Sequence, residues 1–298
     1  MFKRLTGFLL LAAFPVLTHS QSIVSMQQLK QRILDTLSLQ KGEFAIACKD
    51  LTSGKTLFIH EHESFHAAST MKTPVMIEVY KQAAKKKFSL SDSVTLKNEF
   101  KSIVDGSIYS LDTTDDSEYD TYKLIGKKIT IHDLVYKMIT VSSNFAANTL
   151  IELVDAKNVT KTMRNLGAMD IQVLRGVEDQ KAFDNGLNNT TTAYDLMLVF
   201  EKIATGKIVN KNACDAMIKI LLDQKFNTII PAKLPAAVKV AHKTGWITGI
   251  EHDSGIVYLP DGRKYVLVIL SGQLEDENAA IKVLASVSEM IYNYFNPA

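Results

Sequence analysis

Patterns of apolar residues constrain the fold of this chain more than any other feature, because they change type twice along its length. Near the N-terminus, a helical pattern over residues 27–39 precedes two strand-like segments, 44–48 and 55–59, which flank a Thr-Ser-Gly turn. Strand-like segments return near the C-terminus and a last amphipathic helix follows, over residues 236–241, 250–259, 264–270 and 278–294. We therefore expect the two ends of the chain to meet in one mixed α/β lobe.

The middle of the chain has a helical pattern instead. Apolar residues recur at helical spacing over 70–86 and 130–141, and capping residues precede the second of these segments. No linker rich in Pro, Gly or Ser and no internal repeat divides the chain. We predict one unit with an α/β lobe (about 21–62 and 207–298), a helical lobe (about 63–206), and a site in the cleft between the lobes.

Residues 1–20 have the layout of a secretory signal peptide. A basic start precedes the apolar run 8–17, and a short polar stretch ends at Ser20. The apolar run is too short to span a bilayer, which takes about 20 residues, and no cysteine near Ser20 offers a lipid anchor. We expect cleavage after Ser20 and a mature chain, residues 21–298, that is periplasmic or secreted and has no membrane anchor.

Composition narrows the choice of partners. The formal net charge is +2, with 34 Lys and Arg against 32 Asp and Glu, so the broad basic field that nucleic-acid binding requires is missing and we expect no nucleic-acid partner. The two cysteines, Cys48 and Cys214, lie far apart in a chain long enough to form its own core. We interpret them as small buried hydrophobic residues, although a disulfide between them stays open.

The segment Ser69-Thr-Met-Lys72 can supply a nucleophile and its base. On a helix, side chains three residues apart share one face, so the hydroxyl and the amine lie within reach of each other. Serine is a weak nucleophile until a neighbour takes its proton, and a desolvated lysine has a pKa low enough to do so. Pro74 suits the first turn of that helix. Alone, this spacing is common and also fits a solvated helical turn.

Two further motifs follow in the chain. Ser142-Ser143-Asn144 comes directly after a predicted helix, and Lys243-Thr244-Gly245 ends a predicted strand. Each motif alone has an ordinary explanation, as a helix N-cap or a strand end with a turn glycine. In this order, the three motifs resemble those of class A β-lactamases and related penicillin-recognising serine hydrolases, and the resemblance covers nearly the whole mature chain.

The resemblance implies a fold and three catalytic roles. The fold is α/β, of the β-lactamase/transpeptidase kind, with an antiparallel sheet, flanking helices and an all-α lobe. Ser69 would attack a β-lactam or other acyl carbonyl, and Lys72 would accept its proton. Ser142 would pass a proton toward the leaving nitrogen.

The same resemblance implies a substrate-binding set. Asn144 would hold the amide of the substrate's side chain. Lys243 and Thr244 would bind the substrate carboxylate, since a fixed cation beside a hydroxyl gives a charge-assisted contact, with Gly245 directly after them. The backbone N–H groups of Ser69 and Trp246 would form the oxyanion hole.

The water-activating base is the residue on which this chain departs most from the family. Class A β-lactamases carry a loop glutamate, usually followed four residues later by asparagine. Glu178 is the best candidate here, but Ala182 stands where the asparagine would be, and Asp179 and Asp184 are weaker candidates. A surface loop carboxylate is an equal alternative for Glu178, because a general base is defined by geometry. Without a positioned base the acyl-enzyme would persist.

Three other positions near the motifs also differ. Ser143 stands where the family usually has aspartate, which removes a structural carboxylate. Trp246 is bulky where many members have a small residue, so it would narrow the cleft or stack on a substrate ring. His252 stands near the position of a basic residue that assists carboxylate binding, although a plain strand histidine fits equally.

Other functions are consistent with parts of the sequence. His60, His62 and His66 could suggest a zinc hydrolase, but no downstream set of ligands matches them, and we infer no metal and no organic cofactor. A D-alanyl-D-alanine peptidase or esterase, or a slowly deacylating β-lactam sensor, would use Ser69 and Lys72 in the same way. We predict a monomeric serine β-lactamase whose substrate is a β-lactam or a peptidoglycan-like acyl compound.

Overall fold

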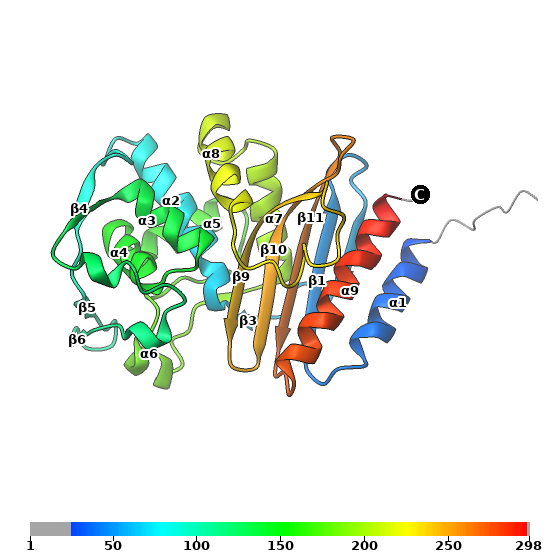
Figure 1. Cartoon of the computed structure of the whole chain (residues 1–298), viewed down its shortest axis with the longest axis horizontal. Helices are drawn as coiled ribbons and strands as arrows, with labels where there is room; N and C mark the ends of the chain where they lie inside the picture. The colour runs from blue at the N-terminus through cyan, green and yellow to red at the C-terminus, as the bar shows by residue number, and fades with distance from the viewer. Residues whose placement is uncertain (1–24, 297–298) are drawn as a thin grey trace, which may run out of the picture.

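A five-stranded antiparallel sheet forms the centre of the computed structural model, which describes residues 25–296. The strand order is β2-β1-β11-β10-β9, so strands from the two ends of the chain are neighbours (Figure 1). The strands are β1 (Glu43–Asp50), β2 (Thr56–Ile59), β9 (Lys239–Ile247), β10 (Ile250–Tyr258) and β11 (Lys264–Gly272). The predicted pairing of the two ends and the predicted fold class are confirmed. The expected signal peptide, residues 1–20, lies outside the described residues.

Helices cover both faces of this sheet. The first and last helices, α1 (Met26–Leu37) and α9 (Glu277–Phe295), lie side by side on one face. On the other face, α7 (Ala193–Ala204) packs against β1, β10 and β11, and α8 (Lys211–Leu222) packs against β9. Successive side chains of a strand point to opposite faces, which explains the apolar run in β1: it contributes to a separate hydrophobic cluster on each side of the sheet.

The remaining helices gather beyond the β9 edge of the sheet (Figure 1). They are α2 (Lys72–Ala84), α3 (Ile131–Thr140), α4 (Asn144–Val154), α5 (Ala156–Asn165) and the short α6 (Gln180–Asp184). Three small ladders tie the connecting loops together: β3 (Phe65–His66) with β8 (Thr190–Thr191), β4 (Ser93–Thr95) with β7 (Lys128–Thr130), and β5 (Phe100–Lys101) with β6 (Ile108–Tyr109). By sequence α7 belongs to the predicted helical lobe, yet it packs on the sheet. The limits of the two lobes stay a prediction.

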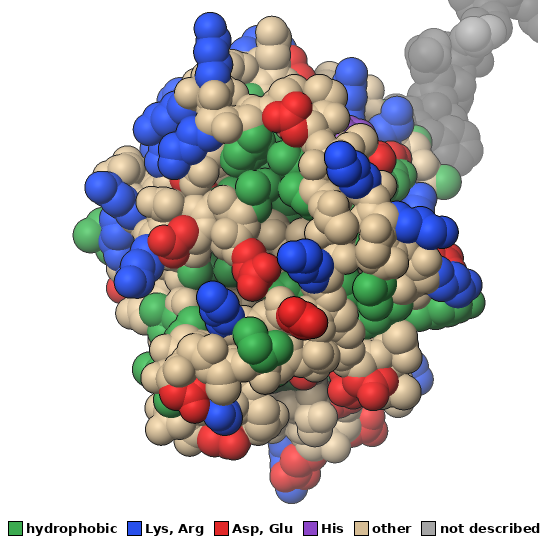
Figure 2. Space-filling view, turned by 90° about the vertical axis from the view of Figure 1, so that its left-hand side faces the viewer, with side chains coloured by type: hydrophobic (Ala, Val, Ile, Leu, Met, Phe, Trp, Pro, Cys, Tyr) green, Lys and Arg blue, Asp and Glu red, His purple; other side chains and the backbone are tan. Residues whose placement is uncertain are grey.

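The surface charges and the two cysteines agree with what the composition predicts. Figure 2 shows the face at the left of Figure 1, where basic and acidic side chains are interspersed, as the near-balance of charges leads one to expect. Cys48 and Cys214 are both buried and free, so the interpretation of them as buried hydrophobic residues is confirmed. Among residues 25–296, no helix combines the length and the apolar character needed to cross a membrane.

Candidate active site

Ser69 lies in a tight turn at the start of α2. A short 3-10 helix, Ala68–Met71, holds it and runs directly into α2, and the preceding Ala68 has a left-handed backbone (φ +44°). Strand β9 approaches this turn closely at Gly245. A Cβ atom on Gly245 would lie 2.9 Å from the backbone nitrogens of both Ser69 and Thr70, a distance that real Cβ contacts do not reach. Glycine at this position therefore lets the strand lie against the turn that carries Ser69.

A cavity of about 630 Å³ opens in front of Ser69. This volume lies in the usual range for small-molecule sites. Four other residues with a predicted catalytic or binding role also line it, namely Ser142, Asn144, Glu178 and Trp246, as does Asp179, a weaker candidate for the base. They come from the α3–α4 junction, the loop before α6 and strand β9, so the structure brings together segments that are far apart in the sequence.

Lys72 lies next to two of these lining residues, with its side chain fully buried. Its Nζ donates to the carbonyl oxygen and the hydroxyl of Ser142 (3.2 Å to Oγ) and to Asn144 Oδ1 (2.8 Å). Burial lowers the pKa of Lys72 to about 7, against the opposing effect of the nearby negative charges of Asp116 and Glu178. A substantial fraction of this amine is therefore neutral at physiological pH and able to accept a proton.

Lys243 reaches the same hydroxyl from the other side. Its side chain is fully buried, and its Nζ donates to Ser142 Oγ (3.0 Å) and to the carbonyl oxygen of Thr244 (2.8 Å). Burial lowers the pKa of Lys243 well below its ordinary value, and the charge of Lys72 acts in the same direction. A serine hydroxyl has two lone pairs and one proton. Because both lysines donate to Ser142 Oγ, its proton is left to donate elsewhere.

The backbone of Ser142 is itself unusual. It has a left-handed conformation (φ +56°), which costs a residue other than glycine roughly 1 kcal/mol or more. This conformation turns the Ser142 carbonyl toward Lys72. Strained backbone of this kind is concentrated at functional sites, and Ala68 and Glu178 in the same cavity share it.

Thr244 and Trp246 follow Lys243 along β9. Thr244 Oγ1 is buried and has no hydrogen-bond partner among the described residues, although buried hydroxyls nearly always have one. The Trp246 ring is 38% exposed and packs edge-on against Phe226, with ring centroids 4.8 Å apart. It therefore forms a wall of the cavity and leaves the space in front of Ser69 open.

Glu178 lines the cavity opposite Ser142 and stands near Asn144. Asn144 Nδ2 lies 3.5 Å from Glu178 Oε1 and donates to the carbonyl oxygen of Asp115 (3.0 Å). Partial burial raises the pKa of Glu178, and the charge of Asp115 raises it further. The carboxyl group thus has a position and a raised basicity that suit a general base. Ala182 is fully buried, so it offers no partner to this carboxylate.

Asn148 fixes the loop that carries Glu178. This buried side chain on α4 accepts from the Val177 backbone nitrogen (2.7 Å) and donates to the Val177 carbonyl oxygen (3.0 Å). Gly176 makes the contact possible, because a Cβ atom there would lie 2.5 Å from Asn148 Oδ1. At the base of the loop, Arg175 donates to the carbonyl oxygen of Leu187 (2.9 Å). Asn148 thus holds the loop against α4, and Arg175 closes its base. Among the described residues, the Glu178 carboxylate itself has Asn144 as its hydrogen-bond partner.

The two weaker candidates for the base have other surroundings. Asp179 is buried, and its carboxylate accepts from the hydroxyl of Ser102 (2.8 Å) and the backbone nitrogen of Ile103 (2.9 Å). Asp184 is exposed and accepts from Gln180 (2.6 Å) at the far end of α6. Of the three carboxylates, Glu178 is the one that faces both Asn144 and the cavity.

Two histidines near the site have different positions. His66 lines the cavity, and its Nδ1 accepts from the Ala68 backbone nitrogen (3.1 Å). His252 is fully buried between the His66 carbonyl oxygen (2.9 Å) and the Ser271 backbone nitrogen (3.1 Å). Burial lowers the pKa of His252 to about 4, so this side chain is neutral. His252 therefore fits the plain strand histidine, and His66 is a lining residue that the motifs did not indicate.

The histidine-rich segment that suggested zinc does not form a ligand cluster. Within the part of the chain that the structure describes, no group of three or more His, Cys, Asp or Glu side chains could hold a metal ion. His60 instead pairs with Glu63 (2.9 Å), and the ring of His62 lies against Tyr194 with centroids 4.7 Å apart. The zinc alternative therefore has no support in this geometry.

The family is decided by comparison with known proteins. The model of the beta-lactamase enzyme family matches residues 28–295 of this chain. The chain belongs to this family. It is similar to a beta-lactamase of Bacteroides uniformis, with 26% identity over 290 residues that cover 90% of this chain and 91% of the relative. Membership confirms the enzyme class that the three motifs predict, a β-lactamase, while the roles of individual side chains stay predictions.

Solved structures share the fold. A beta-lactamase from Sphaerobacter thermophilus matches with a TM-score of 0.77 and 24% identity, over 89% of this chain and 95% of the other. The structure of PBP-A matches with a TM-score of 0.79 and 24% identity, over 91% and 96% of the two chains. At this level of identity the likeness concerns the fold, which agrees with the fold predicted from the motifs.

Proposed function

We propose that this β-lactamase opens β-lactam amides through a Ser69 acyl-enzyme and clears it with water activated by Glu178. One observation carries the first half of this proposal. The hydroxyl of Ser142 lies between two buried lysine side chains, Lys72 and Lys243, beside a cavity that Ser69 also lines. Burying two lysine side chains lowers the stability of a fold. A role in proton transfer would explain why both are buried here.

Acylation uses these groups in sequence. The neutral Lys72 amine takes the Ser69 proton while Oγ attacks the lactam carbonyl, whose oxygen is stabilised by the backbone N–H groups of Ser69 and Trp246. The carbon–nitrogen bond then breaks, and the leaving nitrogen takes the free proton of Ser142. The protonated Lys72 returns a proton to Ser142, so the relay is restored.

The other lining groups orient the substrate. Lys243 and the unpaired Thr244 hydroxyl would receive the substrate carboxylate, with Gly245 keeping the strand close to Ser69. Asn144 would hold the substrate's side-chain carbonyl with the N–H that lies 3.5 Å from Glu178, while its other N–H donates to Asp115 and its oxygen accepts from Lys72. The exposed face of Trp246 would pack against a substrate ring.

Deacylation requires a base on the opposite wall. Glu178 would take a proton from a water molecule that attacks the Ser69 ester, and its raised pKa makes it a stronger base than an ordinary carboxylate. The ester bond breaks, and the proton returns to Ser69 Oγ. The product is the ring-opened acid. We further propose that the protein acts as an exported monomer, which fits the expected signal peptide.

Stopped-flow absorbance and intact-mass analysis with a chromogenic cephalosporin test this proposal. We expect turnover by the wild type, no adduct with Ser69→Ala, and accumulation of the acyl adduct with Glu178→Gln, whose deacylation falls about 100-fold to 10,000-fold. Asp184→Asn is the matched control, because it removes a nearby carboxylate, at the end of α6, that does not line the cavity, and it should turn over like the wild type.

Other outcomes would redirect the assignment. A wild-type protein that stays acylated after one turnover would indicate a slowly deacylating penicillin-binding protein. An adduct that still forms in Ser69→Ala would exclude Ser69 as the nucleophile. Equal deacylation in Glu178→Gln and Asp184→Asn would exclude Glu178 as the base.

A further inference from the structure

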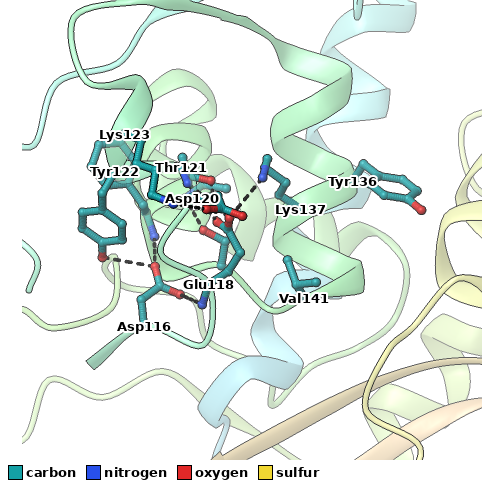
Figure 3. Close-up of polar contacts among 12 residues, drawn as sticks. Asp116, Glu118, Asp120, Thr121, Tyr122, Lys123, Tyr136, Lys137 and Val141 are labelled. Atoms are coloured by element: carbon teal, nitrogen blue, oxygen red, sulfur yellow. Dashed lines mark hydrogen bonds and ion pairs between the residues drawn. The ribbon is translucent and has the colours of Figure 1, made fainter. Parts of the chain in front are cut away.

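The start of helix α4 is held by a carboxylate from a different segment. Asp116 lies between two short 3-10 turns, Thr113–Asp115 and Tyr122–Leu124. Its oxygens accept from the backbone nitrogens of Asn144 and Phe145, both at 2.9 Å, and from the hydroxyl of Tyr122 at 3.1 Å. Figure 3 shows the Tyr122 hydroxyl directed at this carboxylate. No sequence motif includes Asp116.

Together with Ser143, Asp116 completes the cap of this helix. The first N–H groups of an α-helix have no partner within the helix. The Ser143 hydroxyl accepts from the Ala146 nitrogen (3.3 Å), the usual interaction of an N-cap serine. The two preceding amides, of Asn144 and Phe145, would be left without a partner if Asp116 did not accept from them. A negative charge at this end of a helix is favourable as well.

Asp116 is itself firmly held. The neighbouring Ser117 hydroxyl donates to the carbonyl oxygen of Val141 (2.7 Å), at the end of α3. Glu118 pairs with Lys137 of α3 (3.1 Å), and Figure 3 shows this contact beside the Asp116 carboxylate. The segment is therefore fastened to α3 on one side and reaches the start of α4 on the other. It spans the strained turn at Ser142, which connects the two helices.

We propose that Asp116 is a positioning residue, whose carboxylate holds the start of α4, and with it Ser142 and Asn144, in the geometry that acylation requires. This inference rests on the proposed function. It also accounts for Ser143, because the carboxylate that the family usually has at that position is supplied here from another segment. Asp116 also lines the cavity in front of Ser69, but its carboxylate oxygens accept from Asn144, Phe145 and Tyr122, so we assign it a role through the start of α4 and not on the substrate.

The charge of Asp116 provides a readout that separates positioning from general stability. Three charged groups surround Lys72: Asp116 and Glu178, which raise its pKa, and Lys243, which is cationic when protonated. Removing the negative charge of Asp116 lowers the pKa of Lys72 further. Because Lys72 accepts a proton only when it is neutral, the pH midpoint of acylation should move to lower pH.

Single-turnover acylation by a chromogenic cephalosporin, followed by stopped flow and intact mass from pH 5 to 9, tests the inference. We expect Asp116→Asn to acylate about tenfold to a hundredfold more slowly at its best pH, since hydrogen bonds to a charged group are lost, and with a lower pH midpoint. Asp120→Asn is the control. The Asp120 carboxylate is exposed, belongs to the same segment and, among the described residues, forms an ion pair with Lys123 alone (2.7 Å), so the rate and midpoint of this variant should match the wild type.

A double variant covers the possibility that Asp116→Asn does not fold. Adding Ser143→Asp returns a carboxylate to the N-cap of α4, and it should restore folding and most of the acylation rate. The inference is wrong if Asp116→Asn has the rate and midpoint of Asp120→Asn, or if the double variant neither folds nor acylates. If the wild type itself forms no adduct, the proposed function fails instead.

Discussion

At the scale of single residues, the unusual feature of this site is a hydroxyl shared by two amines. Ser142 Oγ accepts from Lys72 and from Lys243, and both lysines are fully buried. Desolvation disfavours the charged form of each lysine, so a protonated Lys72 or Lys243 gives up its proton readily. In the proposed mechanism the serine between them relays protons, and it is the residue whose loss should affect acylation most selectively.

Replacing Ser142 by alanine tests this interpretation. We expect Ser142→Ala to slow acylation by about 100-fold to 10,000-fold, the usual contribution of a positioned proton donor, while any adduct that forms deacylates at nearly the wild-type rate. Rapid-quench intact mass measures the two steps separately. Ser143→Ala is the neighbouring control, and it should lose about 1 kcal/mol of unfolding free energy as a helix cap but acylate within about threefold of the wild type. Equal rates in the two variants would contradict the relay.

At the scale of elements, the position of Ser69 depends on how closely β9 approaches the turn before α2. Gly245→Ala would place a methyl group 2.9 Å from two backbone nitrogens, and backbone atoms cannot move aside as a flexible side chain can. We expect a loss of about 1–3 kcal/mol of unfolding free energy from overpacking and at least a hundredfold slower acylation. Urea denaturation and stopped flow measure the two effects.

Gly262→Asn is a control for this substitution. Gly262 lies in the turn between β10 and β11 with a left-handed backbone (φ +88°), and no atom stands within 4 Å of a Cβ placed there. Asparagine tolerates this conformation better than most residues, so activity should be unchanged. If Gly245→Ala is as active as Gly262→Asn, the close approach of β9 does not position Ser69.

The elements also show which parts of the site a sequence can reveal. Ser69, Lys72 and Lys243 were predictable because their spacing follows from local structure, a helix turn and a strand, although Lys243 lies within β9 and not at the strand end that the sequence suggested. Asp116 and Asn148 were not, because each acts on backbone groups that folding brings near from a distant segment. Glu178 is intermediate. It was a candidate base because of its position in the sequence after the other motifs. The placement of its side chain depends on a left-handed backbone (φ +59°) and on the contacts that anchor the loop.

At the scale of the whole molecule, the packing around the central sheet buries two lysine side chains of the site as well as the hydrophobic core. Its two faces are covered by helices, and the same packing removes Lys72 and Lys243 from water. A fold that keeps two lysines in this state gives up stability to do so, because an unfolded lysine is freely hydrated. The stability of the protein should therefore depend on pH in a way that a typical globular protein's does not.

The pKa of Lys72 fixes the direction of this dependence. Burial lowers the pKa from its ordinary value of 10.5 to about 7 in the folded chain. Below pH 7 both states carry the proton, and the folded state bears the full cost of the buried charge. Between pH 7 and 10.5 the unfolded chain binds a proton that the folded chain does not, so the unfolding free energy rises with pH, by at most about 1.4 kcal/mol per pH unit for one lysine. Lys243 acts in the same direction.

Urea denaturation at pH 7, 8 and 9 measures this effect. Burial raises the pKa of Glu251 to about 7, so this carboxyl acts in the opposite direction, mainly at the lower end of the range. Cys48 and Tyr265 act in the opposite direction, because burial raises their pKa values and the unfolded chain loses those protons first, but only near and above their ordinary values of 9.0 and 10.0. We expect the unfolding free energy of the wild type to increase from pH 7 to 9 and the increase to be smaller in Lys72→Met. The same slope in both proteins would mean that Lys72 keeps an ordinary pKa, and the amine could then not serve as the base for Ser69 at neutral pH.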